Sequence, residues 1–413
     1  MKKTLVAIAA LASVSAFAQS TVTLYGVADV AYVTKTHTNL NGSIAAKTSG
    51  IGEGFNAGNR IGFRGTEDLG GGMKANFVIE NGINITNGQL FSTRAAASGQ
   101  QIDGYGSASG NMPTGSYGTG TNRQSYVGAS GDFGEIRLGY QYTNMYQTST
   151  LRGFHLAAEQ PGGDIGHGII SNSSYGGTRA NGITYITPTM NGINAHLQMG
   201  AGTGRESVEA TAPANGMTTD KNNRSGIMLN FDQGPLSASF AYTTMKIEQA
   251  AVAATTQNAD GTYPAGTGTT NIFGATGGIT TAVGAKSQSN KVTQLGGSYK
   301  AGALKFIGAM SNGTINDSTT ATNSQKTKSS TVGAEYSMGG MRPFVQVGSG
   351  TVTTTSTGAV ANQFKLQQMG VRYDLSKRTT VYAISGVTKD NAVTVAATLQ
   401  KRDATAVGLA HAF

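Results

Sequence analysis

The stretch "NRIGFRGTEDLGGGMKANFVIENG", residues 59–82, decides the fold because it holds two alternating segments joined by a glycine-rich turn. Ile61 and Phe63 alternate with small or polar residues in the first segment, and Phe77 does so in the second. A period of two is the pattern of a β-strand with one apolar and one polar face. The turn between them, 67–72, supplies the Gly and Asp that hairpins need. The stretch therefore predicts an antiparallel hairpin.

The same pattern recurs along the chain, for example in 21–34, 135–141, 192–200 and 367–374. Short turns rich in Gly, Asn, Asp and Ser occur at 67–72, 130–134, 188–192, 232–235, 300–303, 337–341 and 374–378. Longer polar stretches separate the resulting pairs, at 35–55, 86–120, 143–177, 201–222, 248–287, 314–326, 354–360 and 390–398. These seven turns and eight loops make fifteen connections, which predict sixteen strands.

An even number of antiparallel strands with short turns on one side and long loops on the other is typical of outer-membrane barrels. In lipid, an open sheet edge would leave backbone N–H and C=O groups without partners, so the sheet has to close. We therefore predict an all-β fold, a 16-stranded antiparallel transmembrane β-barrel with short periplasmic turns and long extracellular loops. At this size the lumen is too wide for side chains to fill and holds water.

A soluble, secreted β-sandwich or β-solenoid adhesin would also show alternation. A sandwich, however, does not require short turns on one side and long loops on the other. We find no fixed repeat of the length that solenoids show. The barrel is therefore the favoured interpretation, with the adhesin as the alternative.

The first residues have the pattern of a secretory signal peptide. Lys2 and Lys3 precede an apolar run that is too short to span a membrane, and Ala16 and Ala18 form an A-x-A site. We predict cleavage after Ala18 and a single barrel domain at 19–413. The removed segment contains two lysines and no acid, so the formal net charge of +9 falls by two.

The composition narrows the chemistry further. The chain has 60 Gly, 12% charged residues and no Cys, so disulfides and thiolate metal sites are excluded. Its five His have no metal-binding spacing, and no nucleophile motif is present. Lys and Arg are dispersed, which disfavours nucleic acid. We expect no catalysis, no metal and no cofactor, although an enzyme on a barrel scaffold remains an alternative.

Several motifs resemble the general porins of β-proteobacteria, an outer-membrane diffusion porin family of Gram-negative bacteria. They are "TVTLYGVADV" at 21–30, the stretch 59–82, "NRQSYVGASGDFGEIRLGYQY" at 122–142, "GTRANGITYITPTMNG" at 177–192 and the terminal "VGLAHAF". The resemblance covers the whole mature chain, although loops 86–120 and 248–287 are longer than usual.

This resemblance implies the function and the partners. Members of the family are homotrimers in the outer membrane that pass small hydrophilic solutes and inorganic ions, and several favour anions. It implies contacts with outer-membrane lipid and lipopolysaccharide, and with the outer-membrane assembly machinery. A substrate-specific channel on the same scaffold is the nearest alternative function.

The resemblance also implies a constriction of the pore. Its arginine cluster matches Arg60, Arg123 and Arg179, and an acidic residue matches Glu80. Alternation independently turns Arg60, Arg123 and Glu80 inward. If Ile183 faces lipid, strict alternation would put Arg179 on the lipid side.

The third long loop, 143–177, folds into the lumen in the family. Its acids Glu159 and Asp164 would then face the arginines across the pore. A pore with more arginine than acid attracts anions, because guanidinium stays charged and charge rings set the sign of the ions passed. Anion preference is therefore expected.

The chain ends on Phe413, and read by twos from this residue the last strand has an apolar face and a small-residue face. We therefore predict that the end is the closing strand, which pairs with 21–34. By resemblance, the terminal Phe is also the signal that the assembly machinery reads, and His411 departs from the usual residue at its position.

Overall fold

The computed structural model describes residues 21–39, 41–86, 89–90, 123–148, 152, 179–200, 221–249, 286–317, 324–390 and 399–413. These residues form strands and one short helix. The first strands are β1 (Thr21–Asn39), β2 (Ile44–Glu53), β3 (Arg60–Gly70), β4 (Met73–Asn84), β5 (Gln89–Leu90), β6 (Gln124–Gly131) and β7 (Gly134–Tyr142), followed by α2 (Asn144–Tyr146). Next come β8 (Arg179–Ile186), β9 (Ile193–Gly200), β10 (Lys221–Gln233), β11 (Leu236–Gln249), β12 (Lys286–Ala301) and β13 (Leu304–Asp317). The last are β14 (Gln325–Tyr336), β15 (Met341–Thr354), β16 (Val360–Asp374), β17 (Thr379–Asp390) and β18 (Leu399–Ala412).

The strands pair antiparallel in chain order and close into a ring. One edge of β1 pairs with β3 over Thr21–Val27 and then with β2 over Val30–Thr38. Its other edge pairs with β18 over Val27–Asn39. Since β2 and β3 follow one another along the same edge, they form one interrupted strand of the wall, and β5 only pairs with the end of β4. The eighteen strands therefore occupy sixteen positions, and the predicted sixteen-stranded barrel is confirmed.

All seven predicted short turns join consecutive antiparallel strands in the structure. The prediction of a loop at 35–55 was wrong. There, β1 continues to Asn39, and β2 begins at Ile44 and pairs back onto it. Threonine and other β-branched residues in 34–51 have high strand propensity, and a polar strand of this kind looks like a loop in the sequence. The wall of the barrel is therefore taller at this hairpin than predicted.

The two faces of the wall differ as the alternation predicted. Phe63 and Ile79 are 47% and 42% exposed, whereas Glu80 beside them is 5% exposed. Soluble monomers rarely expose large contiguous apolar surface. Exposed apolar side chains continue around the ring, at Val127, Leu138, Ile183, Leu197, Leu229, Leu295, Phe306, Val345, Met369 and Leu409. This outer face suits lipid, and the polar inner face suits water.

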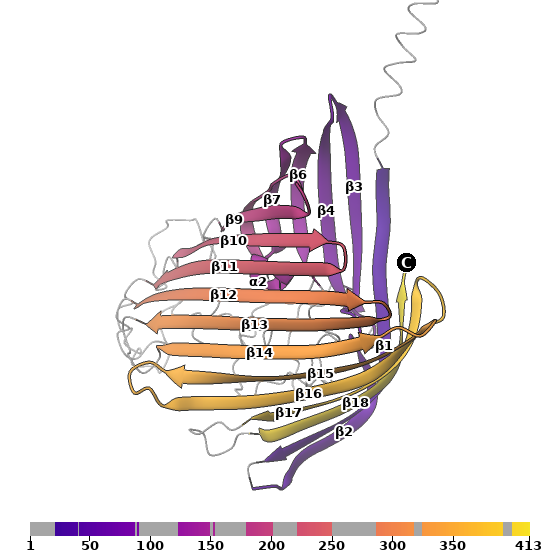
Figure 1. Cartoon of the computed structure of the whole chain (residues 1–413), viewed down its shortest axis with the longest axis vertical. Coiled ribbons are helices and arrows are strands. Elements are labelled where there is room, and N and C mark those ends of the chain that lie inside the picture. The colour runs from indigo at the N-terminus through magenta and orange to yellow at the C-terminus, as the bar shows by residue number, and fades with distance from the viewer. Residues whose placement is uncertain are drawn as a thin grey trace, which may run out of the picture.

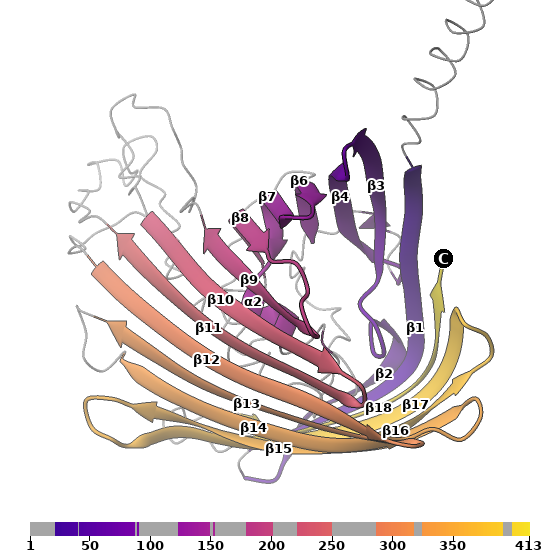
Figure 2. The ribbon, with the colours of Figure 1, turned by 45° about the horizontal axis from the view of Figure 1, so that its top comes forward.

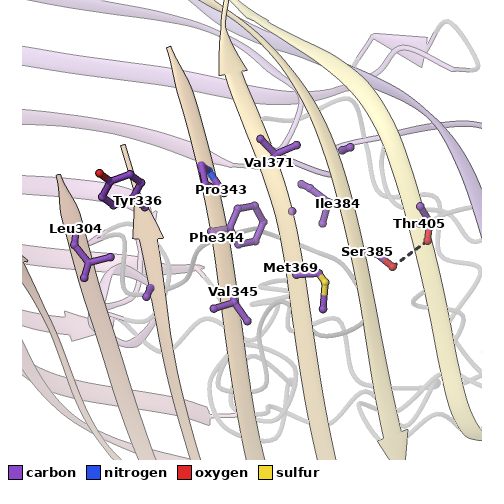
Figure 3. A pocket seen from close by; sticks show the side chains of 13 residues that line it. Leu304, Tyr336, Pro343, Phe344, Val345, Met369, Val371, Ile384, Ser385 and Thr405 are labelled. Atoms are coloured by element: carbon purple, nitrogen blue, oxygen red, sulfur yellow. Dashed lines mark hydrogen bonds between the residues drawn. The ribbon is translucent and has the colours of Figure 1, made fainter. Parts of the chain in front are cut away.

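The strands form one curved wall, with α2 on its inner side (Figures 1 and 2). A shallow apolar depression over β13–β18 belongs mainly to the outer face, where Tyr336, Val345 and Met369 border it (Figure 3). It is therefore part of the lipid-facing surface and separate from the lumen. Within the described residues, no helix is long and apolar enough to cross a membrane.

Candidate pore constriction

The centre of the site is Glu80, which lies on the inner face of β4. Its neighbour Ile79 points outward, so the period of the strand turns Glu80 into the lumen. The pairing of β4 with β3 and β6 places Glu80 opposite Gly62 on one side and Gln124 on the other. Arg60 begins β3 and Arg123 directly precedes β6, so both arginines enter the lumen close to this carboxylate.

Glu80 is held by four side chains. Arg123 Nε donates to Glu80 Oε1 at 2.6 Å, and Tyr142 Oη donates to the same oxygen at 2.8 Å. Tyr25 Oη donates to Oε2 at 3.1 Å, and Arg60 Nε lies 3.8 Å from Oε2. A buried carboxylate is stable only when charge-assisted hydrogen bonds replace the water it loses. These contacts fix the carboxylate and fix the two guanidinium groups around it.

The two arginines beside Glu80 differ in how accessible they are. The side chain of Arg123 is 11% exposed, and its Nη2 also donates to Tyr142 Oη at 2.8 Å. The side chain of Arg60 is 28% exposed, and its Nη1 donates to the carbonyl of Gly58 at 3.2 Å. Arg60 is therefore the more accessible of the two from the lumen.

Arg179 joins the same group through aromatic rings. Its guanidinium lies 5.0 Å from the ring centre of Tyr142 and 5.8 Å from that of Tyr146, within cation–π range. The two tyrosine rings stack at 4.8 Å. Arg179 and Tyr142 are cross-strand partners at the ends of β8 and β7. Strict alternation from Ile183 would place Arg179 on the lipid side, but the contact of its partner Tyr142 with Glu80 shows that this pair turns inward.

The described part of the third loop starts inside the barrel. Thr143 caps α2 by accepting from the N–H of Tyr146 at 3.3 Å. Asn144 N–H donates to Gln198 Oε1 of β9 at 3.3 Å, and Thr148 and Ser239 of β11 share a hydrogen bond of 3.1 Å. These partners lie on the inner wall, so the loop crosses from β7 towards β11 within the lumen. This confirms the inward-folded start of the third loop.

The predicted loop acids Glu159 and Asp164 lie outside the described residues. Among the four predicted site residues that the structure describes, it brings Arg60, Glu80 and Arg123 into direct contact and sets Arg179 beside Tyr142. This group contains three cations and one anion.

The sequence reasoning missed three tyrosines of the site. Tyr25 and Tyr142 bind Glu80, and Tyr146 stacks on Tyr142. Alternation from the outward Leu24 could have found Tyr25, because it turns that residue inward. Tyr142 could not be found in this way, since alternation from Leu138 would have placed it outside.

One anchor of the third loop provides a test of its position. Arg152 Nη2 lies 2.8 Å from both carboxylate oxygens of Asp232, at the short-turn end of β10. Asp232→Ala should loosen the loop and raise the current noise of the open channel. Stability should change by less than about 1 kcal/mol because the pair is partly exposed. Single-channel recordings would show this, with Asp403→Ala as the control; unchanged noise would contradict the anchoring role.

The chain is similar to known proteins. A family model described as Gram-negative porin matches residues 4–393. Outer membrane porin protein 32 of Delftia acidovorans is 34% identical over a match that covers 60% of each chain. Major outer membrane protein P.IB of Neisseria meningitidis serogroup B is 34% identical over 34% of this chain and 33% of its own. The matches to these relatives therefore span less than two thirds of their lengths.

Solved structures share the fold. An anion-selective porin from Comamonas acidovorans has a TM-score of 0.65 at 24% identity, over 96% of this chain and 100% of that chain. OmpT of Vibrio cholerae, as expressed in the outer membrane, has a TM-score of 0.59 at 12% identity, over 95% of this chain and 98% of its own. At these identities the likeness supports the fold alone.

Proposed function

The chain belongs to the Gram-negative porin family, and we propose that it forms an outer-membrane channel for passive diffusion of small hydrophilic solutes and ions, with a preference for anions. Members of the family are channels and not enzymes, and the polar inner face of the barrel suits a water-filled path. The observation that carries the anion preference is the group around Glu80, in which Arg60, Arg123 and Arg179 outnumber the one carboxylate found among the described residues.

Electrostatics explain the preference. A guanidinium keeps its charge at any relevant pH. Charges that line a narrow passage with low-dielectric walls focus their field on the solute path. Glu80 offsets part of this field, and its larger role is to hold Arg60 and Arg123 in place. Attraction in water is about 1 kcal/mol for unit charges about 4 Å apart, which selects anions without trapping them.

The biological setting is part of the proposal. The chain is exported by its signal peptide, residues 1–18, which is removed, and residues 19–413 fold in the outer membrane with the help of the assembly machinery. The mature barrel associates as a homotrimer and contacts lipid and lipopolysaccharide. Support comes from the family and from the exposed apolar band. The solved OmpT of Vibrio cholerae includes a trimer form.

Purified protein in planar bilayers and in swelling liposomes tests this function. Single-channel current should be proportional to voltage, and sugar entry should rise linearly with concentration and fall with solute size. Saturable entry of one solute would contradict a general porin and favour a substrate-specific channel. Correctly folded protein without conductance would contradict the channel function and favour an adhesin or a barrel enzyme.

A further inference from the structure

The interruption between β2 and β3 is an inward-folded segment of the wall. After Glu53 the chain leaves the edge of β1, and it returns to that edge at Arg60. Gly54 begins this segment with a φ of 76°, a backbone conformation that glycine adopts without strain. We call residues 54–59 the inner segment.

Asp29 of β1 holds the inner segment in place through hydrogen bonds. Its Oδ2 accepts from the backbone N–H groups of Asn56 and Ala57, both at 2.7 Å. Its backbone carbonyl accepts from the N–H of Gly54 at 3.1 Å, and its own N–H donates to Asn59 Oδ1. The other carboxylate oxygen accepts from Tyr382 Oη of β17. Asp29 is fully buried, so its carboxylate depends on these donors in place of water.

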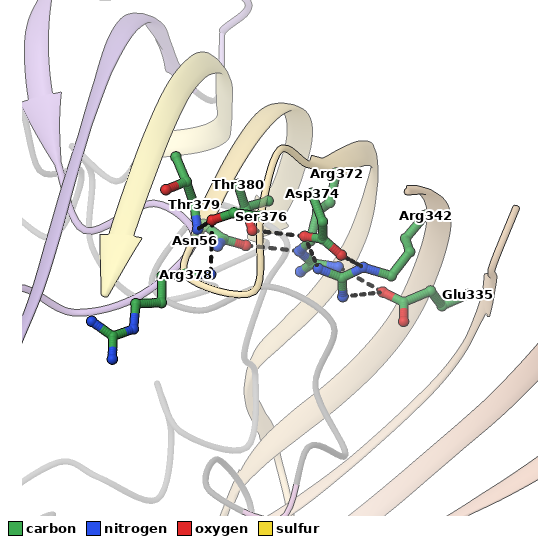
Figure 4. A network of polar contacts seen from close by, with 9 residues as sticks. All are labelled: Asn56, Glu335, Arg342, Arg372, Asp374, Ser376, Arg378, Thr379 and Thr380. Carbon is green, nitrogen blue, oxygen red and sulfur yellow. Dashed lines mark hydrogen bonds and ion pairs between the residues drawn. The ribbon is translucent and has the colours of Figure 1, made fainter. Parts of the chain in front are cut away.

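Asn56 of the inner segment reaches β16. Arg372 Nε donates to Asn56 Oδ1 at 2.7 Å, and Arg372 Nη1 lies 2.9 Å from Glu335 Oε2 of β14 (Figure 4). The Arg372 guanidinium also lies 4.3 Å from the ring centre of Phe344. In the ring, β16 is separated from β1 by β18 and β17. The segment therefore extends over the inner side of the closing seam, which is the pairing of β1 with β18.

The inner segment also explains an apolar cluster on the lumen side. Phe55 is fully buried and packs with Val33 of β1, and the Lys35 ammonium lies 5.5 Å from its ring centre. Ala406 and Ala410 of β18 belong to the same cluster. The small side chains on the inner face of β18 thus leave space at the seam for Tyr382 and the inner segment.

The segment is connected directly to the constriction. Asn59 Nδ2 donates to Glu53 Oε2 at 2.9 Å, and the same oxygen accepts from the N–H of Ile85, just beyond β4, at 2.6 Å. Arg60 follows Asn59 in sequence and donates to the carbonyl of Gly58. The path of the inner segment therefore sets the position of the Arg60 guanidinium.

We propose that the inner segment is a second constriction element of the pore, and that Asp29 is a positioning residue for it and for Arg60. The inner segment lies on β1 and β16, whereas the described start of the third loop lies on β9–β11, at opposite sides of the ring. The two elements narrow the lumen from both sides. This inference rests on the proposed channel function.

Asp29→Ala tests the positioning role, with Asp29→Asn as its matched partner. Asparagine keeps an oxygen for the two backbone N–H groups, so Asp29→Asn should behave like the wild type. Asp29→Ala should raise the single-channel conductance and the current noise. It should also lower the anion-to-cation permeability ratio by about twofold. This is the change expected when the Arg60 guanidinium moves from about 4 Å to about 8 Å from the ion path in water. Asp403→Ala, at an exposed pair with Lys401, controls for charge removal.

The outcomes separate the possible explanations. Equal changes in Asp29→Asn and Asp29→Ala would show that the charge matters and would overturn the positioning role. Wild-type current in Asp29→Ala trimers of normal heat stability would overturn it as well. A wild-type protein that does not conduct would instead contradict the proposed function, so the two failures are distinguishable.

A cysteine probe tests whether the inner segment borders the ion path even if Asp29→Ala fails to fold. The chain has no cysteine, so Ala57→Cys is a unique thiol. An anionic methanethiosulfonate reagent should modify it and lower the single-channel current. Ser356→Cys, on the exposed turn between β15 and β16, should be modified without a change in current. A Cys at 57 that resists the reagent, or whose modification leaves the current unchanged, would overturn the proposal.

Discussion

A channel in which glutamine replaces Arg60, Arg123 and Arg179 is expected to prefer cations. Among the described residues of the group, the substitutions leave Glu80 as the only charge, and Tyr25 and Tyr142 still donate hydrogen bonds to it. Each guanidinium attracts a nearby anion by about 1 kcal/mol in water, so each loss lowers the permeability ratio about fivefold. The zero-current potential of the triple variant in a KCl gradient should therefore have the opposite sign to that of the wild type.

Arg137→Gln is the matched control for this variant. Arg137 is an arginine of β7 that makes a two-bond pair with Glu135, at 2.8 Å for each bond, closer to the short turn. Within the part of the chain that the structure describes, Glu80 forms ion pairs with Arg60 and Arg123 and not with Arg137. Removal of Arg137 should therefore change the permeability ratio much less than removal of any of the three arginines. Anion preference that survives in the triple variant would contradict the role of the group.

Deletion of Phe413 is expected to lower the yield of assembled trimers in cells about 30-fold. Phe413 N–H donates to the carbonyl of Gly26 at 3.1 Å, and Gly26 N–H donates back at 3.0 Å. A side chain at Gly26 would collide with the Phe413 ring, so the ring covers this glycine at the seam. Two hydrogen bonds and the ring contact together contribute about 2 kcal/mol or more, which corresponds to this loss.

The trimers that do form without Phe413 should conduct like the wild type, because this residue lies on the outer face with Leu409. Gly26→Val distinguishes packing at the seam from recognition of the terminal residue. It should reproduce the loss of yield if packing matters, since it displaces the ring and keeps the Phe. Heat-modifiable gel mobility measures the yield, and a normal yield in the deletion variant would contradict the prediction.

The sequence was sufficient for the barrel and for the inward direction of most residues of the candidate constriction. Alternation depends on local spacing, so the turn at 67–72 and the inward sides of Arg60 and Glu80 could be read from residues 59–82 alone. The strand number followed in the same way from counting turns and loops. These features need no knowledge of contacts between distant parts of the chain.

Other features depend on tertiary contacts. Asp29 binds Tyr382 from a position 353 residues earlier in the chain, and Asn56 binds Arg372 across 316 residues. No local pattern reveals such contacts, so the inner segment, which begins at the end of the predicted loop 35–55, could not be predicted from the sequence. Arg179 was assigned to the site through the resemblance, because alternation pointed to the lipid side. Alternation fails here because the last residue of β7, Tyr142, and the first residue of β8, Arg179, turn inward and break the period of two.

The zero-current potential of wild-type trimers across a bilayer with a KCl gradient tests the central claim most directly. It compares chloride with potassium in one measurement and needs no substitution. The arginine-rich constriction predicts a potential with the sign of the chloride equilibrium potential. A potential with the sign of the potassium equilibrium potential would contradict the anion preference and the role assigned to Arg60, Arg123 and Arg179.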